Sequence, residues 1–188
     1  MTRASKLMLA GAAAMLCAGS LMAGDRHRDD DDDRGREKGR FAVRADLVGY
    51  QEVPALSTTA RGRFTAWIDS RANTIHWRLS YEALEGEVQQ AHVHFGQRGV
   101  NAGISFFLCT NLGNGPAGTQ ACPVSPGEIS GIVTPDQVIG PGPTATAPGQ
   151  GIEPGAFDEI VAAIREGVAY ANVHTTKWPG GEIRGQLH

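Results

Sequence analysis

The sequence predicts an all-β fold, an antiparallel Greek-key β-sandwich or barrel with one short helix. Apolar and polar residues alternate along several short segments, which is the period of a strand that buries one face. Turns rich in glycine, proline, aspartate and asparagine separate these segments. Only one stretch shows the helical period instead. Short strands joined by such turns favour two packed sheets or a closed barrel.

The first three strands follow from alternation alone. In residues 41–47 every second position is apolar, from Phe41 to Leu47. Residues 62–69 and 74–81 alternate in the same way. The segment between them, Asp69-Ser70-Arg71-Ala72-Asn73, has the composition of a hairpin turn, so we expect these two strands to be antiparallel neighbours.

Five further strands are expected later in the chain. They lie at residues 88–95, 104–109, 127–133, 168–175 and 182–187. The last two are separated by Trp178-Pro179-Gly180-Gly181, which again has the composition of a turn.

One helix is expected shortly before the last two strands. Phe157, Ile160, Val161 and Ile164 recur at helical spacing, and Gly167 follows as a stop signal. Its apolar stripe is expected to pack on the core. The preceding residues 134–155 are rich in proline and glycine and are expected to be irregular or mobile.

The N-terminal residues predict export. Residues 1–24 have the layout of a secretory signal peptide, with Arg3 and Lys6 before an apolar stretch that is short for a membrane span. We therefore expect a periplasmic or secreted protein without a membrane span. Residues 25–40 are almost wholly charged or glycine and are expected to form a disordered tether, so residues 41–188 remain as one domain.

Charge and cysteine content narrow the function further. The formal net charge of −3 would become more negative after loss of Arg3 and Lys6, which argues against a nucleic-acid partner. Loss of the leader would also remove Cys17 and leave Cys109 and Cys122 as a pair. In an oxidising compartment we expect a disulfide between them, and a redox-active or metal-binding pair is the less favoured alternative.

Two of the predicted strands carry histidines in matching surroundings. His92 and His94 alternate with apolar residues, and His174 ends a similar alternating run. Side chains two positions apart share one face of a strand, so the three imidazoles converge if the strands are neighbours. We expect His92, His94 and His174 to bind copper, or alternatively zinc, on a solvent-accessible outer face. Val93 and Val173 would anchor the same strands in the core.

Other interpretations of these polar residues stay open. The three histidines could instead be solvated or hydrogen-bonded across the strands, and Tyr170 and Asn172 could orient metal-bound imidazoles. The other histidines are weaker candidates for metal ligands. We expect His76 to be a surface residue, and His27 and His188 lack a fixed geometry. The run Glu182-Ile183-Arg184 suggests a cross-strand ion pair rather than a catalytic dyad.

Several motifs resemble those of the CHRD domain, a module first described in chordin and also found in small exported microbial proteins. The resemblance covers nearly the whole domain from about residue 41. It rests on Leu47-Val48-Gly49-Tyr50-Gln51-Glu52-Val53-Pro54, Ala91-His92-Val93-His94-Phe95-Gly96, Gly167-Val168-Ala169-Tyr170-Ala171-Asn172-Val173-His174-Thr175 and Pro179-Gly180-Gly181-Glu182-Ile183-Arg184-Gly185-Gln186-Leu187.

The histidine strand is also similar to the copper strand of copper-zinc superoxide dismutase. That likeness implies a dismutase-like or immunoglobulin-like sandwich and copper ligation by His92, His94 and His174. The clustered histidines and aspartate of the dismutase zinc site have no counterpart here, so dismutase activity is not carried over. No Ser-His-Asp arrangement or phosphate-binding loop is apparent either, and we assign no catalytic residues.

Two functions follow as hypotheses. The first is an exported metal-binding protein with a three-histidine site that acts in copper handling or, as the less favoured role, in redox chemistry. The second is a metal-independent extracellular module that binds another protein or a second copy of itself. Trp67, Trp77 and Trp178 would support this second function only if one of them is exposed in a patch, and Trp178 is the best candidate because it lies in a turn.

Overall fold

A computed structural model describes residues 39–140 and 150–188, which form an antiparallel sheet of 8 strands with one α-helix. The strand order is β5-β4-β7-β8-β1-β2-β3-β6. The strands are β1 (Arg40–Val48), β2 (Arg61–Asp69), β3 (Thr74–Glu82), β4 (Val88–Phe95), β5 (Ile104–Thr110), β6 (Gly127–Val133), β7 (Ala169–Thr175) and β8 (Ile183–Gln186). The all-β antiparallel prediction is confirmed.

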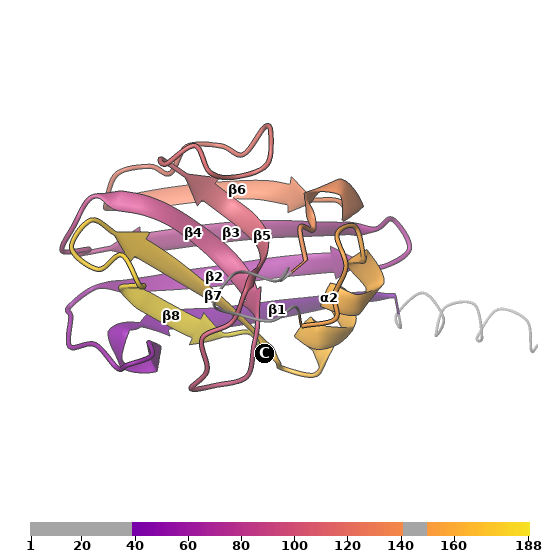
Figure 1. The fold of residues 1–188 in the computed structure, drawn as a ribbon, viewed down its shortest axis with the longest axis horizontal. Helices are drawn as coiled ribbons and strands as arrows, with labels where there is room; N and C mark the ends of the chain where they lie inside the picture. The colour runs from indigo at the N-terminus through magenta and orange to yellow at the C-terminus, as the bar shows by residue number, and fades with distance from the viewer. Residues whose placement is uncertain (1–38, 141–149) are drawn as a thin grey trace, which may run out of the picture.

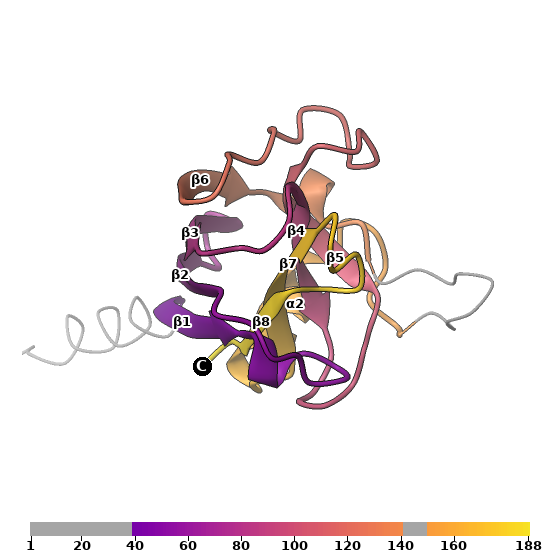
Figure 2. The same ribbon diagram turned by 90° about the vertical axis from the view of Figure 1, so that its left-hand side faces the viewer.

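The sheet folds back on itself to make two layers (Figure 1, Figure 2). One layer holds β1, β2, β3 and β6, and the other holds β5, β4, β7 and β8. The layers join where β1 meets β8, through the single register pair Val48↔Arg184 and hydrogen bonds between Arg44 and His188. The result is a nearly closed, barrel-like sandwich.

Alternation in the sequence places the core between the layers. In β3, Ile75, Trp77, Leu79 and Tyr81 are buried, whereas the residues between them are exposed or half-buried. Strands β1 and β2 repeat this pattern for most of their length. Strand β7 differs because all of its residues are buried, so both of its faces are covered. This double burial is where the candidate site lies.

Helix α2 (Phe157–Arg165) closes one end of the sandwich (Figure 1). The apolar residues at helical spacing, Phe157, Ile160, Val161 and Ile164, are buried in the core as predicted. Gly167 follows with φ of 68°, a left-handed conformation that glycine adopts without steric cost. None of the helices in the described residues has the length and apolar character needed to cross a bilayer.

The disulfide between Cys109 and Cys122 is confirmed. It ties the end of β5 to the segment that leads into β6, and the Asn111 side chain adds hydrogen bonds to backbone atoms of Val88 and Cys122. Two 3₁₀ turns are also present, at Gly49–Gln51 and Pro135–Gln137. The predicted signal peptide and nearly all of the predicted tether lie outside the described residues, while Arg40 already belongs to β1.

Candidate metal centre

Strands β4 and β7 are hydrogen-bonded neighbours, as the convergence of the histidines requires. Their antiparallel register pairs His92 with Asn172, His94 with Tyr170 and Gln90 with His174. Val93 and Val173 point into the core and are fully buried, so the three histidines lie on the opposite, outer face.

The three imidazoles form a compact cluster. One ring nitrogen from each of His92, His94 and His174 lies within 4.8 Å of the other two. The ring centroids are 4.9 Å apart for His92 and His174 and 5.4 Å apart for His92 and His94. The described residues therefore hold a group of three imidazole ligands of the kind that binds a metal.

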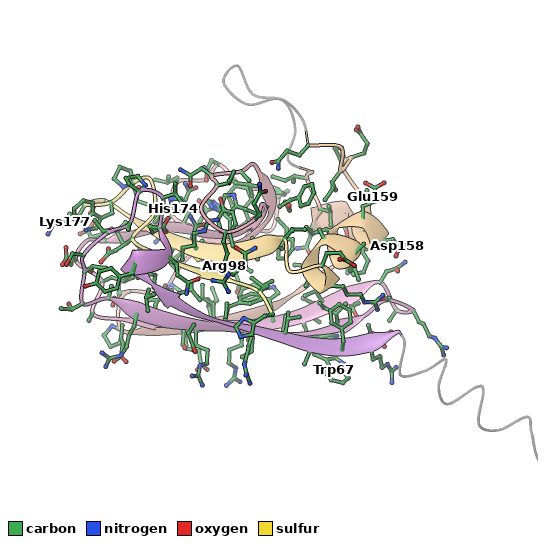
Figure 3. All side chains as sticks on the ribbon, turned by 90° about the horizontal axis from the view of Figure 1, so that it is seen from below. Trp67, Arg98, Asp158, Glu159, His174 and Lys177 are labelled. Atoms are coloured by element: carbon green, nitrogen blue, oxygen red, sulfur yellow. A yellow bond between two sulfur atoms is a disulfide. The ribbon has the colours of Figure 1, made fainter. Side chains whose placement is uncertain are left out.

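The cluster is closed to solvent, and the expectation of a solvent-accessible face is wrong. His92 is 1% exposed, His94 6% and His174 8%. The loop between β4 and β5 and the turn between β7 and β8 cover this face of the sheet, because they bring Ala102 to His94 and Pro179 to His174. Figure 3 shows His174 in this layer, while Trp67 projects outward from the other one.

Hydrogen bonds select the ring nitrogens that face the centre. The Nδ1 of His174 donates to the carbonyl oxygen of Pro179 at 2.9 Å, which leaves the Nε2 lone pair free. The Nδ1 of His94 lies 3.0 Å from the carbonyl oxygen of Ala102. Among the described residues, Nε2 of His174 and both ring nitrogens of His92 have no hydrogen-bond partner although they are buried.

Burial keeps all three imidazoles neutral. Desolvation, followed by repulsion from His174 and His94, lowers the pKa of His92 to about 2. Burial also lowers the pKa of His94 to about 4, against a partial opposing effect of its hydrogen bonds to Ala102 and Asn172. The pKa of His174 is lowered by burial as well. Neutral imidazoles with free lone pairs are the form that binds metals.

Tyr170 and Arg184 stack on one side of His94. The ring of Tyr170 lies parallel to the His94 ring, with 4.6 Å between the two centroids. Arg184, on the neighbouring strand β8, places its guanidinium 3.4 Å from the Tyr170 centroid. The Tyr170 hydroxyl accepts a hydrogen bond from the Ala102 backbone N–H. Tyr170 thus orients the imidazole and also holds the loop that covers it.

Arg184 fixes the same loop from β8. Its guanidinium donates to the carbonyl oxygens of Gln97 and Val100, at 3.1 and 2.9 Å. The cross-strand ion pair predicted for the run Glu182-Ile183-Arg184 is wrong, because neither charged residue forms a salt bridge among the described residues. Glu182 instead accepts hydrogen bonds from the Thr58 and Thr175 hydroxyls and the Glu85 N–H.

Comparison with known proteins places the chain in a family. A family model described as the CHRD domain matches residues 43–187. The chain belongs to the CHRD domain family. No curated protein and no solved structure matched the chain, so the likeness to copper-zinc superoxide dismutase stays a prediction.

Glu52 of the CHRD domain belongs to the surroundings of the site and was not predicted. It is 6% exposed, and burial raises the pKa of its carboxyl group to about 7, against opposing effects of Arg184, the Val53 backbone N–H and a hydrogen bond from Asn172. Asn172 in turn contacts Nε2 of His94 through its Oδ1 at 3.0 Å. The family resemblance could have pointed to Glu52, because it includes the motif Gly49-Tyr50-Gln51-Glu52-Val53-Pro54.

The other sequence candidates lie away from the cluster. His76 is exposed on the outer face of β3, and His188 is exposed and contacts the Gln186 carbonyl oxygen. His27 lies outside the described residues. Trp178 is half-buried and donates to Glu85, whereas Trp67 is 50% exposed. Trp67, rather than Trp178, is therefore the tryptophan available on the surface of the CHRD domain.

The residues present fit a metal ion. Three neutral imidazoles converge, one has a fixed Nδ1–H tautomer, and the nitrogens left without partners face a shared space. A buried imidazole without hydrogen bonds is destabilising, and coordination of a metal would satisfy its lone pair. His92, His94 and His174 would hold the ion, with Tyr170 and Asn172 orienting them.

Proposed function

We propose that this CHRD domain protein is exported and binds a metal ion, copper in preference to zinc, through His92, His94 and His174. The observation that carries the proposal is the set of buried ring nitrogens without hydrogen-bond partners in the cluster, above all both nitrogens of His92. A histidine that served packing alone would be expected to pair at least one of them.

The donor chemistry supports copper. Imidazole nitrogen binds copper and zinc well, and the affinity order of divalent metals places Cu²⁺ above Zn²⁺. CHRD domains are typically extracellular, and the Cys109–Cys122 disulfide is consistent with secretion. An extracellular metal-binding domain with a closed site suits storage or transfer of the ion better than turnover of a substrate, because solvent and substrate do not reach the centre.

Metal retention tests the proposal directly. The protein is incubated with copper or zinc, dialysed extensively and analysed for metal, beside a variant with His92, His94 and His174 all changed to Ala. His76→Ala is the matched control, because His76 is an exposed histidine on another strand. We expect about one copper per chain in the parent and in the control, and none above background in the triple variant.

Each variant is first checked for folding by circular dichroism and cooperative unfolding. No retained metal in the folded parent would refute the proposal. Equal metal in the parent and the folded triple variant would also refute it, since the ion would then bind elsewhere in the chain.

A second candidate function is an extracellular interaction module. Trp67 and Ile132, 50% and 49% exposed, flank His76 in one cross-strand row on the outer face of β2, β3 and β6. Such a row suits contact with a protein partner or a second copy of the chain. Sedimentation of the parent beside a Trp67→Ser variant tests the second-copy form. Self-association lost in the variant supports it, and a monomeric parent refutes it.

A further inference from the structure

A hydrogen-bond mismatch at His94 points to a second buried group that takes part in the site. Each ring nitrogen of His94 lies 3.0 Å from an oxygen, Nδ1 from the Ala102 carbonyl and Nε2 from Oδ1 of Asn172. Both oxygens only accept, and a neutral imidazole has one N–H to donate. With Nδ1–H donating to Ala102, Nε2 has a lone pair aimed at another acceptor.

Two arrangements resolve the mismatch. The first is a doubly protonated His94, which its buried position disfavours. The second turns the Asn172 amide so that its N–H donates to Nε2 of His94, which points the amide oxygen towards Glu52 on the other side. An amide oxygen accepts, so Glu52 would then have to donate, and only a protonated carboxyl group can do so.

The surroundings of Glu52 allow it to exist in both forms. Arg184 on β8 favours the carboxylate, whereas burial favours the protonated acid. Tyr170 on β7 is another titratable group close to Glu52. Arg98, in the loop between β4 and β5, is the other cation near Arg184. No described lysine, arginine or histidine comes within ion-pair distance of Glu52, and its Oε1 has no hydrogen-bond partner.

If a metal took the Nε2 lone pair of His94, the Asn172 N–H would lose its acceptor on His94. The amide would then turn to donate to Glu52, whose carboxyl proton would pass to the solvent and leave the carboxylate. We propose that Glu52 is a positioning residue that balances the charge of the three-histidine site by releasing one proton as the metal binds, with Asn172 relaying the change to His94. This inference rests on the proposed function.

The histidines themselves contribute little to such proton release near neutral pH. Burial already lowers the pKa of His92 to about 2 and that of His94 to about 4, and it lowers the pKa of His174 too. Burial raises the pKa of Glu52 to about 7, so Glu52 would be mostly protonated at pH 6 and mostly ionised at pH 8. Proton release should therefore fall from about one per metal to near zero over this interval.

Titration calorimetry with copper(II) sulfate measures the release. The full chain is titrated from pH 6 to pH 8 in weakly coordinating buffers of different ionisation enthalpy, and the triple histidine variant supplies the background. The test variant is Glu52→Gln, and the matched control is Glu82→Gln, an exposed carboxylate paired with Arg61. We expect Glu52→Gln to bind one copper without proton release at pH 6 and about tenfold more weakly than the parent at pH 8.

The outcomes separate this inference from the proposed function. A parent that binds no copper refutes both. A parent that binds copper with the same proton release at pH 6 and pH 8 refutes only the role of Glu52, as does a Glu52→Gln variant with unchanged release and affinity. The pH profile of the parent decides the question even if Glu52→Gln fails to fold.

Discussion

His92 is a buried side chain whose chemistry is poorly suited to a packing role. At 1% exposure it touches Phe107 edge-on at 4.5 Å, and both of its ring nitrogens lack hydrogen bonds among the described residues. His94, two residues later, has a contact at each nitrogen. The two neighbours therefore differ in what their imidazoles contribute to the folded protein without metal.

Leucine substitution should separate these contributions. His92→Leu removes two unsatisfied buried polar atoms, so we expect the metal-free protein to become more stable by about 1 kcal/mol. His94→Leu leaves Ala102 and Asn172 without their partner, so we expect a loss of about 1–3 kcal/mol. Urea unfolding in the presence of a chelator measures both values, and both variants should lose bound copper. A strongly destabilised His92→Leu would indicate a structural role instead.

Arg184 combines stacking, loop anchoring and charge in one side chain. It is 1% exposed, lies over the Tyr170 ring and donates to two carbonyl oxygens of the covering loop. Lysine keeps the charge but lacks the planar fork, so we expect Arg184→Lys to lower the free energy of unfolding by about 2–4 kcal/mol. The control Arg63→Lys, at an exposed ion pair with Asp46, should change it by less than ~1 kcal/mol. Equal effects in urea unfolding would contradict this role of Arg184.

At the scale of elements, alternation predicted the strands closely but was silent about what covers them. The expected strand at residues 41–47 is observed as Arg40–Val48, and the expected strand at 74–81 as Thr74–Glu82. Alternation records which face is apolar, and it cannot show that a loop buries the polar face as well. The solvent-accessible site was a wrong prediction for this reason.

The contacts that close the site join distant parts of the chain without any local periodicity. Glu52 follows the turn after β1, yet it hydrogen-bonds Asn172 in the middle of β7. Arg184 reaches Val100 in the loop between β4 and β5. The three histidines could be predicted from the sequence, because His92, His94 and His174 have matching apolar neighbours. Their strands β4 and β7 pair as expected.

The turn between β7 and β8 shows how closely these covering segments fit. Gly181 has φ of 126°, and a Cβ atom there would overlap the carboxyl group of Glu52. The adjacent Gly180 has open space where a Cβ atom would lie, which makes it a matched control. We expect Gly181→Ala to cost about 2 kcal/mol and to weaken copper binding, because it strains the backbone and displaces Glu52.

Thermal unfolding and copper titration of both glycine variants check this expectation. Gly180→Ala should stay within ~0.5 kcal/mol of the parent and should keep its affinity. A Gly181→Ala protein with the stability and copper affinity of the parent would contradict this expectation. It would show that the turn accommodates the added Cβ atom without strain and that copper binding does not depend on the observed position of Glu52.

For the whole molecule, the buried histidines and Glu52 act on the pH dependence of stability in opposite directions. Each histidine has a lowered pKa in the folded protein, so its contribution is present above the ordinary value of 6.5 and is lost as the pH falls. Glu52 has a raised pKa, so its contribution is present below the ordinary value of 4.5 and is lost as the pH rises towards about 7. Because three histidines oppose the single carboxyl group of Glu52, the histidines should determine how the free energy of unfolding changes between pH 6 and pH 5.

We expect the metal-free protein to lose about 2–3 kcal/mol of unfolding free energy when the pH falls from 6 to 5, because unfolding then takes up roughly two protons net. Glu52→Gln removes the opposing group and should steepen this loss to about 4 kcal/mol, whereas the triple histidine variant should reverse its sign. Urea unfolding in a chelating buffer at several pH values measures the slopes. A parental slope near zero would mean that the histidines protonate freely in the folded state, which a closed cluster does not permit.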